Sequence, residues 1–496
     1  MSLKLGFILF VLGVGLVESR AKHQWGKLTA DKIEQFKKAH PRTNVDRFVS
    51  ALDRMNERMA TKEPTAEEKL NLAEIIKGLK NHKRSPRHHK EGDSLSQINT
   101  NAGIANSLYG GDMVLSDPQV DVILGDFLDD SETGRDKRQA HYSAKYPTDL
   151  WGNTFYYYFD ASLSAKAKKA AQMAIAFWQN STCVDFVESQ TNPNRVRFFK
   201  DGDGCYSDVG MMGGVQVLSL GTGCEYFYIA AHEIGHALGF FHEQSRYDRD
   251  TAITVNSGNV IPDQRYNYNK LTTSNNNNYL MPYDYGSIMQ YDELAFTSNN
   301  GRTMFAKRAV YQNTMGSALI SFYDISMMNS YYKCKAKCPN GATCVNGGFR
   351  NSRNCNVCIC PSGWGGITCS ERESGCGAAL IAKGPIQTQS ITIGANNEFD
   401  TEYETFEKCN YIIRAPMGYK IEVILKTMTG IDCIPGCVYK GIEVKAMSDH
   451  RYTGIRYCCE EDIGTKIVSE GNVMPVSLIG PGCNIPGYFI LRLACM

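Results

Sequence analysis

Three histidines lie close together in residues 232–242, which read HEIGHALGFFH. His232 and His236 are four residues apart, and an α-helix turns every ~3.6 residues, so both rings would lie on one helical face. Gly239 is suited to end this helix, because glycine readily adopts the left-handed conformation found at helix ends. The turn there would bring His242 back toward the other two rings. Three nitrogen ligands with one open position are typical of a catalytic zinc site, whereas structural sites have four protein ligands.

Glu233 lies beside the first of these histidines and has the chemistry of a general base. It is close enough to take a proton from a metal-bound water without being a ligand itself. The alternative is a helix with stray histidines in its core. The neighbouring residues are apolar, and uncoordinated His and Glu side chains among them would be costly to bury. The pattern therefore favours one catalytic Zn²⁺ ion held by His232, His236 and His242.

Length, charge and cysteine usage describe a secreted protein of several domains. A chain of 496 residues exceeds one hydrophobic core, and a net charge of +1 provides no overall field for nucleic acid or anionic membranes. Residues 1–19 have the pattern of a secretory signal, with Lys4 followed by an apolar run that is short for a membrane span; a signal anchor is the alternative. All 18 cysteines follow residue 180, which indicates disulfides formed in an oxidising compartment. We expect an extracellular protein without a membrane anchor.

The region before the first cysteine is polar and reads as a leader, residues 20–138. It has two helical patterns, near 30–59 and 66–79, followed by a basic run at 80–90 that contains His82, His88 and His89. A metal site formed by these histidines is one interpretation. A solvated linker is the interpretation that the run of charges favours.

Strand and helix patterns surround the histidine motif. Strands are expected at 154–159, 184–187, 196–199 and 215–220, and a helix at 164–179. This order predicts a twisted sheet backed by two helices. A second, more irregular lobe would follow His242, with the active cleft between the lobes.

The residues that follow the motif resemble one family in particular. Glu243 follows the third histidine directly, and Met289 is followed two residues later by Tyr291. The long zinc motif with a methionine turn is typical of metzincins, and these neighbours resemble the astacin family of zinc endopeptidases over residues 139–334. The resemblance implies that Met289 forms a floor beneath the zinc site and that Tyr291 hydrogen-bonds the transition state. It also implies that Glu243 contacts the new N-terminus once a pro-segment is removed. Gln244, Tyr247 and Gln290 depart from the commoner family residues, which affects the expected loop geometry and none of the ligands.

The same resemblance implies synthesis as a zymogen. Astacin pro-segments carry a Gly-Asp pair whose carboxylate takes the open zinc position, and we identify Asp126 as its match. A Gly-Asp pair on its own would indicate only a turn. Twelve residues later Arg138 ends the basic sequence RDKR, a suitable site for a proprotein-processing protease. Cleavage there would make Gln139 the first residue of the mature enzyme.

Cysteines and one sequon complete the assignment of this region. By resemblance, Cys183 pairs with Cys334 and Cys205 pairs with Cys224. Asn180 lies in the only Asn-x-Ser/Thr sequence of the chain and is a predicted glycosylation site.

Two smaller modules are expected after the catalytic domain. Residues 335–370 resemble an EGF-like module, which implies first–third, second–fourth and fifth–sixth pairing of six cysteines, namely Cys338, Cys344, Cys355, Cys358, Cys360 and Cys369. Spacing alone leaves fifteen connectivities open, and zinc binding is the alternative use of these cysteines. Residues 376–495 have regularly spaced strand patterns that predict a β-sandwich, and with Cys376 and Cys409 they resemble a CUB domain. Lys440 follows Tyr439 where many CUB domains have a calcium-binding Asp, so that kind of calcium site is not expected.

The sequence thus predicts a multidomain α+β protein: signal 1–19, pro-segment 20–138, catalytic domain 139–334, EGF-like module 335–370 and CUB domain 376–495. The expected activity is hydrolysis of peptide bonds in extracellular or matrix proteins, with Glu233 as the base. The alternative is a matrix-binding protein whose protease lobe is a relic. The complete set of ligands and the base argue against that alternative.

Overall fold

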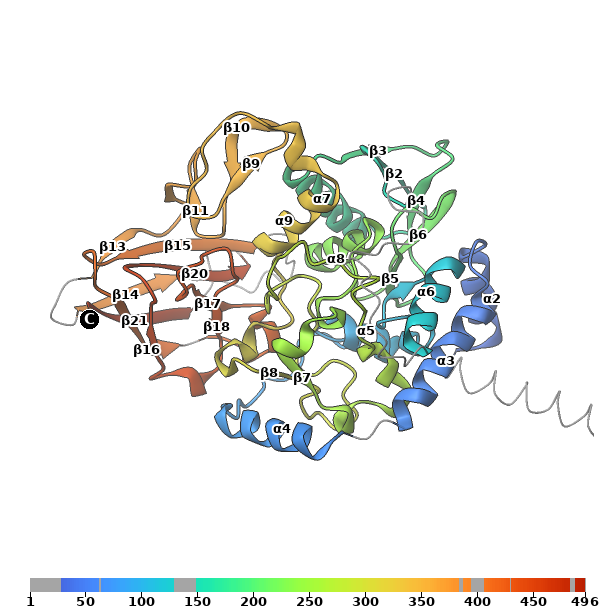
Figure 1. Cartoon of the computed structure of the whole chain (residues 1–496), viewed down its shortest axis with the longest axis horizontal. Helices are drawn as coiled ribbons and strands as arrows, with labels where there is room; N and C mark the ends of the chain where they lie inside the picture. Colours follow the sequence, from blue (N-terminus) through green and yellow to red (C-terminus); the bar gives the residue numbers. More distant parts are fainter. Residues whose placement is uncertain are drawn as a thin grey trace, which may run out of the picture.

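The computed structural model describes residues 28–61, 64–128, 149–382, 387–393, 406–428, 430–481 and 487–495. The predicted signal peptide and the predicted processing site, Arg138–Gln139, lie outside these residues. No helix in the described ranges is long and apolar enough to cross a membrane. Figure 1 shows the first N-terminal helices, within residues 30–61, and a β-sandwich on opposite sides of a central sheet-and-helix domain.

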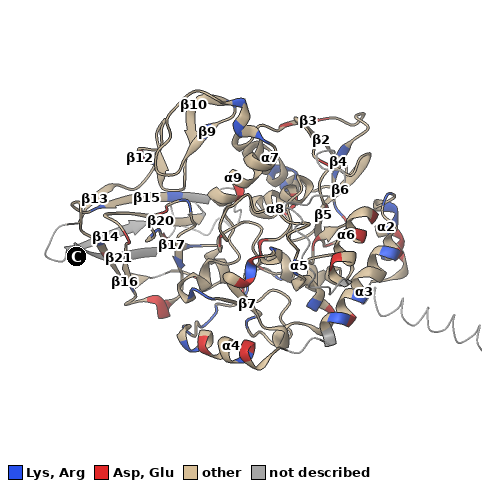
Figure 2. Ribbon diagram, in the orientation of Figure 1, with Lys and Arg blue, Asp and Glu red and all other residues tan. Residues whose placement is uncertain are grey.

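The N-terminal segment folds mainly into helices. They are α2 (Ala30–Ala39), α3 (Val45–Thr61), α4 (Ala66–Gly78), α5 (Leu95–Ala102) and α6 (Asp117–Leu128), with a short η1 (Ala105–Ser107). The sequence predicted one helical pattern at 30–59, whereas the structure has two helices there, α2 and α3. They are separated at His40–Asn44, because α2 ends at the cap residue His40. Lys and Arg alternate with Asp and Glu along α2, α3 and α4, as expected of solvated surfaces (Figure 2). In Figure 1, α4 lies apart from α2 and α3, beside β7 and β8.

A six-stranded sheet forms the first lobe of the central domain. Its order is β1-β5-β6-β4-β2-β3. The strands are β1 (Met113–Val114), β2 (Thr154–Phe159), β3 (Asp185–Glu188), β4 (Arg195–Phe199), β5 (Cys205–Asp208) and β6 (Val215–Leu220). The N-terminal segment supplies β1, which pairs in parallel with β5, with Met113 opposite Ser207. The leader is therefore part of the sheet beside the cleft.

Two helices pack together in this lobe, α7 (Ala165–Ser181) and α8 (Phe227–Ala237). Ser164 caps α7 by accepting a hydrogen bond from Ala167 N. The buried face of α7 carries several alanines, whose small side chains permit close approach to α8. Trp178 of α7 donates its indole N–H to Ala231 O at 3.0 Å, which fixes α7 against the helix that carries the histidines.

The second lobe has little regular structure. It contains the antiparallel pair β7 (Ile253–Val255) and β8 (Met304–Ala306), the helix α9 (Phe322–Tyr331), and the short turns η2 (Glu243–Ser245), η3 (Arg249–Thr251), η4 (Ser257–Asn259), η5 (Pro262–Tyr268), η6 (Ala309–Thr314) and η7 (Cys334–Lys337). Ser321 and Asp324 form a capping box at the start of α9. The predicted pairs Cys183–Cys334 and Cys205–Cys224 are both present.

The segment after Cys334 is held by three disulfides in the order that the EGF-like resemblance implies: Cys338–Cys355, Cys344–Cys358 and Cys360–Cys369. Its strands are β9 (Phe349–Asn351), β10 (Asn354–Ile359), β11 (Trp364–Gly365) and β12 (Glu371–Arg372).

The C-terminal β-sandwich has two sheets, β13-β15-β20-β17-β18 and β14-β21-β16-β19. The first contains β13 (Ala379–Ile381), β15 (Phe406–Arg414), β17 (Gly441–Val444), β18 (Ile455–Tyr457) and β20 (Val473–Pro481). The second contains β14 (Gln387–Ile393), β16 (Ile421–Met428), β19 (Lys466–Val468) and β21 (Gly487–Cys495), and the turns are η8 (Pro435–Cys437) and η9 (Glu460–Asp462). Cys376 pairs with Cys409 as predicted. Two further bridges, Cys433–Cys459 and Cys437–Cys458, were not predicted.

Candidate active site

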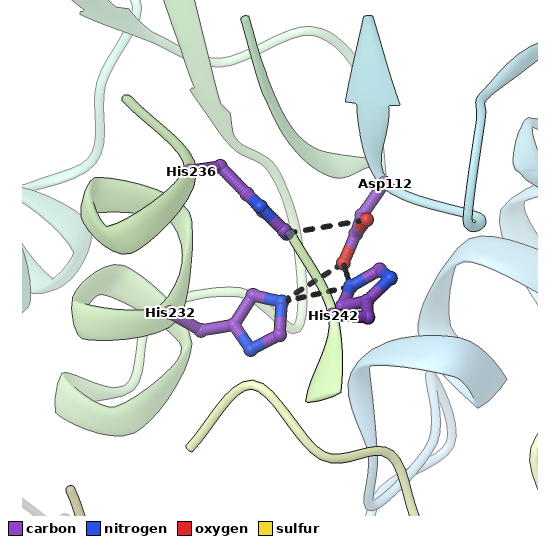
Figure 3. Close-up of side chains that lie close together, drawn as sticks. All are labelled: Asp112, His232, His236 and His242. Carbon is purple, nitrogen blue, oxygen red and sulfur yellow. Dashed lines mark hydrogen bonds and ion pairs between the residues drawn. The ribbon is translucent and has the colours of Figure 1, made fainter. Parts of the chain in front are cut away.

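The three histidine rings of the motif meet around one carboxylate (Figure 3). His232 and His236 project from one face of α8, and Gly239 follows the helix with a φ of +111°, as predicted for its end. Asp112 Oδ2 lies 3.0 Å from Nε2 of His232 and 3.0 Å from Nε2 of His242. Asp112 Oδ1 lies 3.4 Å from Nε2 of His236. Four metal-ligating side chains thus converge on one buried point.

In two of the rings, a hydrogen bond made by Nδ1 leaves Nε2 as the nitrogen that faces Asp112. His232 Nδ1 donates to Ile288 O at 2.7 Å, and His236 Nδ1 donates to Phe240 O at 2.7 Å. A proton on Nδ1 leaves Nε2 as a lone-pair donor, which is the usual arrangement of a metal-ligating histidine. Within the described chain, His236 Nε2 and Asp112 Oδ1 have no hydrogen-bond partner although both are buried. Three imidazole nitrogens and a carboxylate oxygen are a donor set that Zn²⁺ accepts, so the residues fit the metal.

The carboxylate at this point is Asp112, and the prediction that Asp126 would occupy it is wrong. Asp126 lies in α6, and its Oδ2 accepts hydrogen bonds from Thr272 Oγ1 at 2.7 Å, Ser274 Oγ at 2.6 Å and Asn275 Nδ2 at 3.1 Å. Those partners belong to a loop of the second lobe. Asp126 therefore anchors α6 to that loop and does not contact the histidines.

A second Gly-Asp in the leader, Gly110-Gly111-Asp112, carries the signal that was missed. Both glycines have positive φ, +67° at Gly110 and +92° at Gly111. A Cβ at Gly110 would lie 2.7 Å from the His242 ring, and a Cβ at Gly111 would lie 2.6 Å from Phe296. Only glycine lets the backbone pass close enough for Asp112 to reach the histidines.

Burial and neighbouring charge set the electrostatics of the site. Burial opposes ionisation of Asp112, but the neighbouring rings of His242, His236 and His232 hold its pKa well below the usual range. Burial raises the pKa of Glu233 well above its ordinary value, and the charge of Asp112 raises it further. Among the described residues, neither oxygen of Glu233 has a hydrogen-bond partner. Glu233 is thus a buried carboxyl group next to the histidines that nothing in the described structure holds in place.

Met289 and Tyr291, the two residues of the methionine turn that the family resemblance singled out, lie against the three histidines. Met289 packs beneath α8, and a Cβ at Gly235 would meet its sulfur at 3.0 Å. Tyr291 donates its hydroxyl hydrogen to Asp112 Oδ2, and its ring lies 4.4 Å from the ring of His242. Asp324 of α9 holds this turn by accepting a hydrogen bond from Ile288 N at 2.9 Å.

Gln244 and Gln290, two residues that depart from the commoner family pattern, both make hydrogen bonds in this structure. Gln244 Oε1 accepts a hydrogen bond from Tyr291 N at 3.1 Å, so this side chain holds the backbone of the methionine turn. Gln290 accepts a hydrogen bond from the Tyr283 hydroxyl. Neither substitution disturbs a proposed ligand.

Glu243 is buried in the second lobe, away from the ring nitrogens. Its Oε1 accepts hydrogen bonds from Arg246 Nη1 at 2.8 Å and from Asp284 N at 2.9 Å. Burial raises its pKa to about 7, opposed by the charge of Arg246 and by the Asp284 hydrogen bond. Glu243 and Arg246 also line a pocket together with Gly239, Leu271, Met327 and Tyr331.

A three-histidine site on a helix and the turn after it, above a methionine turn, defines a metzincin-type metalloproteinase domain. Comparison with known proteins gives the same class. Residues 143–333 match the family model of the astacin peptidases, and residues 382–481 match the CUB domain model.

Two nematode proteins and one solved structure illustrate the similarity. Zinc metalloproteinase nas-31 of Caenorhabditis elegans is 43% identical over 488 residues, which cover 94% of this chain and 79% of the relative. Zinc metalloproteinase nas-32 of the same species is 38% identical over 383 residues, which cover 77% of this chain and 57% of the relative. The high choriolytic enzyme 1 of Oryzias latipes, a hatching enzyme zinc-protease, is 33% identical with a TM-score of 0.34, covering 40% of this chain and 94% of the enzyme. The chain belongs to the astacin family of zinc metalloproteinases.

Proposed function

We propose that this chain is the inactive precursor of a secreted zinc endopeptidase and that Asp112 is its zymogen switch. The observation that carries the proposal is the position of Asp112, with both carboxylate oxygens facing the three ligand rings. The zinc site needs one open position for substrate and water. A carboxylate delivered by the leader takes that position, so the precursor is silent.

Activation requires the leader to leave. We propose that a proprotein-processing protease cuts after Arg138 and that Gln139 becomes the first residue of the mature enzyme. Residues 1–19 would direct the chain into the secretory pathway, in keeping with eight disulfides among the described residues. Mass spectrometry of the protein recovered from culture medium tests this: the expected N-terminus is Gln139 or its pyroglutamate, and a chain that still begins within 20–138 contradicts it.

The residues around the site have separate roles in the proposed reaction. Zinc, when bound by His232, His236 and His242, supplies Lewis acidity that polarises a peptide carbonyl and makes water a nucleophile near neutral pH. Glu233 accepts the proton of the attacking water and delivers it to the leaving amine. Tyr291, released from Asp112, donates its hydroxyl hydrogen to the oxyanion.

Tyr291→Phe is expected to lower kcat about 10²–10³-fold with little change in KM, because one oxyanion donor is lost while ground-state contacts remain. Steady-state kinetics of the mature enzyme on a quenched fluorescent peptide provides the measurement. An unchanged kcat would give Tyr291 a purely structural role.

Glu243→Gln is expected to lower Tm more than it lowers kcat. Arg246 Nη1 would lose its carboxylate partner in a buried setting, and a loss of about 1–3 kcal/mol corresponds to a fall of roughly 3–10 °C. Thermal unfolding and kinetics on the same preparation measure both quantities. A variant that melts normally but is inactive would place Glu243 among the catalytic residues.

The substrates that we propose are extracellular or matrix proteins, because EGF-like and CUB modules accompany the catalytic domain. No nucleic acid or membrane role is proposed. Cleavage-site profiling of the mature enzyme on a denatured extracellular proteome would give its sequence preference. A random distribution of cuts would contradict a defined substrate class.

A further inference from the structure

The leader crosses between the catalytic domain and the CUB domain as a basic segment without regular secondary structure, residues 80–90, of sequence KNHKRSPRHHK. The expectation that this run is a solvated linker is wrong for His82 and Arg84. The side chain of His82 is 6% exposed, and that of Arg84 is 18% exposed. No cluster of the three histidines forms among the described residues, because each one has a different partner.

Carboxylates from both domains receive this segment. His82 Nε2 lies 2.9 Å from Asp462 Oδ1 of the CUB domain, and Lys80 Nζ lies 3.6 Å from the same oxygen. Arg84 pairs with Glu293 of the catalytic domain, whose side chain is 2% exposed. Negative charges therefore line both sides of the seam, which is the boundary between the two domains along which residues 80–90 lie.

Neutral contacts specify the path of the segment as closely as the charges do. Arg84 Nη2 donates to Asn313 Oδ1 at 2.9 Å, and Asn313 Nδ2 in turn donates to Asp462 Oδ2 at 3.4 Å. Ser85 N donates to Cys433 O at 3.0 Å, and Cys433 N donates to Ser85 Oγ at 2.9 Å. The Cys433–Cys459 disulfide ties the CUB side of this contact to the segment that carries Asp462.

The far end of the run is bound by the same part of the CUB domain. His88 Nε2 lies 3.2 Å from Asp432 Oδ2, and its ring lies 4.5 Å from the ring of Tyr439. The seam thus binds backbone, guanidinium and imidazole groups over nine residues of chain, from Lys80 to His88. It has the properties of a peptide-binding groove.

We propose that this seam, lined by Glu293, Asp462 and Asp432, is a docking site of the mature enzyme for an extended basic segment of a protein substrate. The inference rests on the proposed function, in that the leader must leave before the groove can open. Departure of Lys80 and His82 removes the basic partners of Asp462, whereas Glu293 keeps Arg302 Nε at 2.8 Å when Arg84 leaves. The Asp462 carboxylate then faces the open seam without a cationic partner among the described residues, and a basic segment is complementary to it. The leader occupies the seam in the precursor and so excludes another segment from it.

Binding of a labelled peptide tests the proposal directly. The probe is a fluorescein-labelled peptide of residues 80–90, with the same peptide carrying Arg84→Ala as its control. Fluorescence anisotropy is measured with the enzyme cut after Arg138 and freed of the leader, and with an uncleavable Arg138→Ala precursor. The cut enzyme is expected to bind the probe, with affinity at least about tenfold weaker for the Arg84→Ala peptide, and the precursor is expected not to bind. High salt is expected to weaken the interaction.

Protein variants assign the binding to the seam. Asp462→Asn removes one charge within the CUB domain and is expected to weaken the probe about tenfold without changing hydrolysis of a short peptide. Glu422→Gln is the matched control, because Glu422 pairs with Lys466 on the other sheet of the sandwich. If both variants weaken binding of the probe equally, the probe responds only to the net charge of the enzyme, and the proposal fails.

The remaining outcomes separate this inference from the proposed function. A cut enzyme that hydrolyses a short peptide but does not bind the probe overturns the docking site and leaves the peptidase intact. A leader that stays bound after cleavage also overturns it, because the groove then serves only its own segment. Binding of the probe by a cut enzyme without hydrolytic activity supports the docking site while the proposed function fails.

Discussion

Glu233→Gln in the mature enzyme is expected to abolish nearly all turnover, with a loss of about 10²–10⁴-fold in kcat, while folding and zinc content stay unchanged. The physical reason is the position of the carboxyl group: it is buried next to the three rings, yet both of its oxygens lack a hydrogen-bond partner within the described residues. Glutamine has the same shape but cannot take a proton. Kinetics on a quenched fluorescent peptide, with metal analysis of the same preparation, provides the measurement.

The matched control for this variant is His236→Gln. It is expected to lose both zinc and activity, because His236 is one of the three proposed ligands. Retained zinc with lost activity in the Glu233 variant therefore separates a base from a ligand. Activity within about tenfold of the unaltered enzyme would fall below the range of general-base effects and would exclude this role.

Asp112→Ala is expected to make the uncleaved precursor active. The experiment uses precursor protected by Arg138→Ala, so that any activity arises with the leader attached. The Asp112 carboxylate lies 3.0 Å from the Nε2 atoms of His232 and His242 and accepts a hydrogen bond from Tyr291. A hydrogen bond to a charged group contributes about 1.5–3 kcal/mol, so losing one raises the open fraction about 10- to 100-fold.

Asp126→Ala is the control that the chain offers for this prediction. Its carboxylate contacts Thr272, Ser274 and Asn275, so its loss should loosen α6 and leave the precursor silent. If both variants stay silent, steric blockade by the leader accounts for inhibition. If Asp126→Ala alone becomes active, the inhibitory group has been misassigned.

Short-range spacing made the catalytic helix predictable. The four-residue spacing of His232 and His236 and the glycine after the helix are local features. Residues four apart lie on one face of a helix and glycine commonly ends one, so these features alone predict that both rings point the same way and that the helix ends there. The disulfide Cys183–Cys334 joins residues 151 positions apart, and only the family resemblance could suggest it.

The zymogen residue could not be found by the same reasoning. Asp112 reaches the histidines because β1 pairs with β5, an interaction of the leader with a strand about ninety residues later. Distance from the processing site favoured Asp126, but chain distance does not report which segment enters the cleft. The pair Gly110-Gly111 was the available signal, since two adjacent glycines permit the close approach that the structure requires.

The basic run at 80–90 shows the limit of charge patterns. A cluster of Lys, Arg and His usually remains solvated. Here its partners come from η9 and from the loop after the methionine turn, which lie more than two hundred residues further along the chain. Nothing within the run itself distinguishes a linker from a segment that is bound between two domains.

The most direct test of the account is hydrolysis of one quenched fluorescent peptide by purified precursor and by the same protein cut after Arg138, each with and without a zinc chelator. The account predicts a silent precursor and an active cut product that loses its activity to the chelator and regains it when zinc is added back. A precursor as active as the cut product, or activity that survives the chelator, would contradict it.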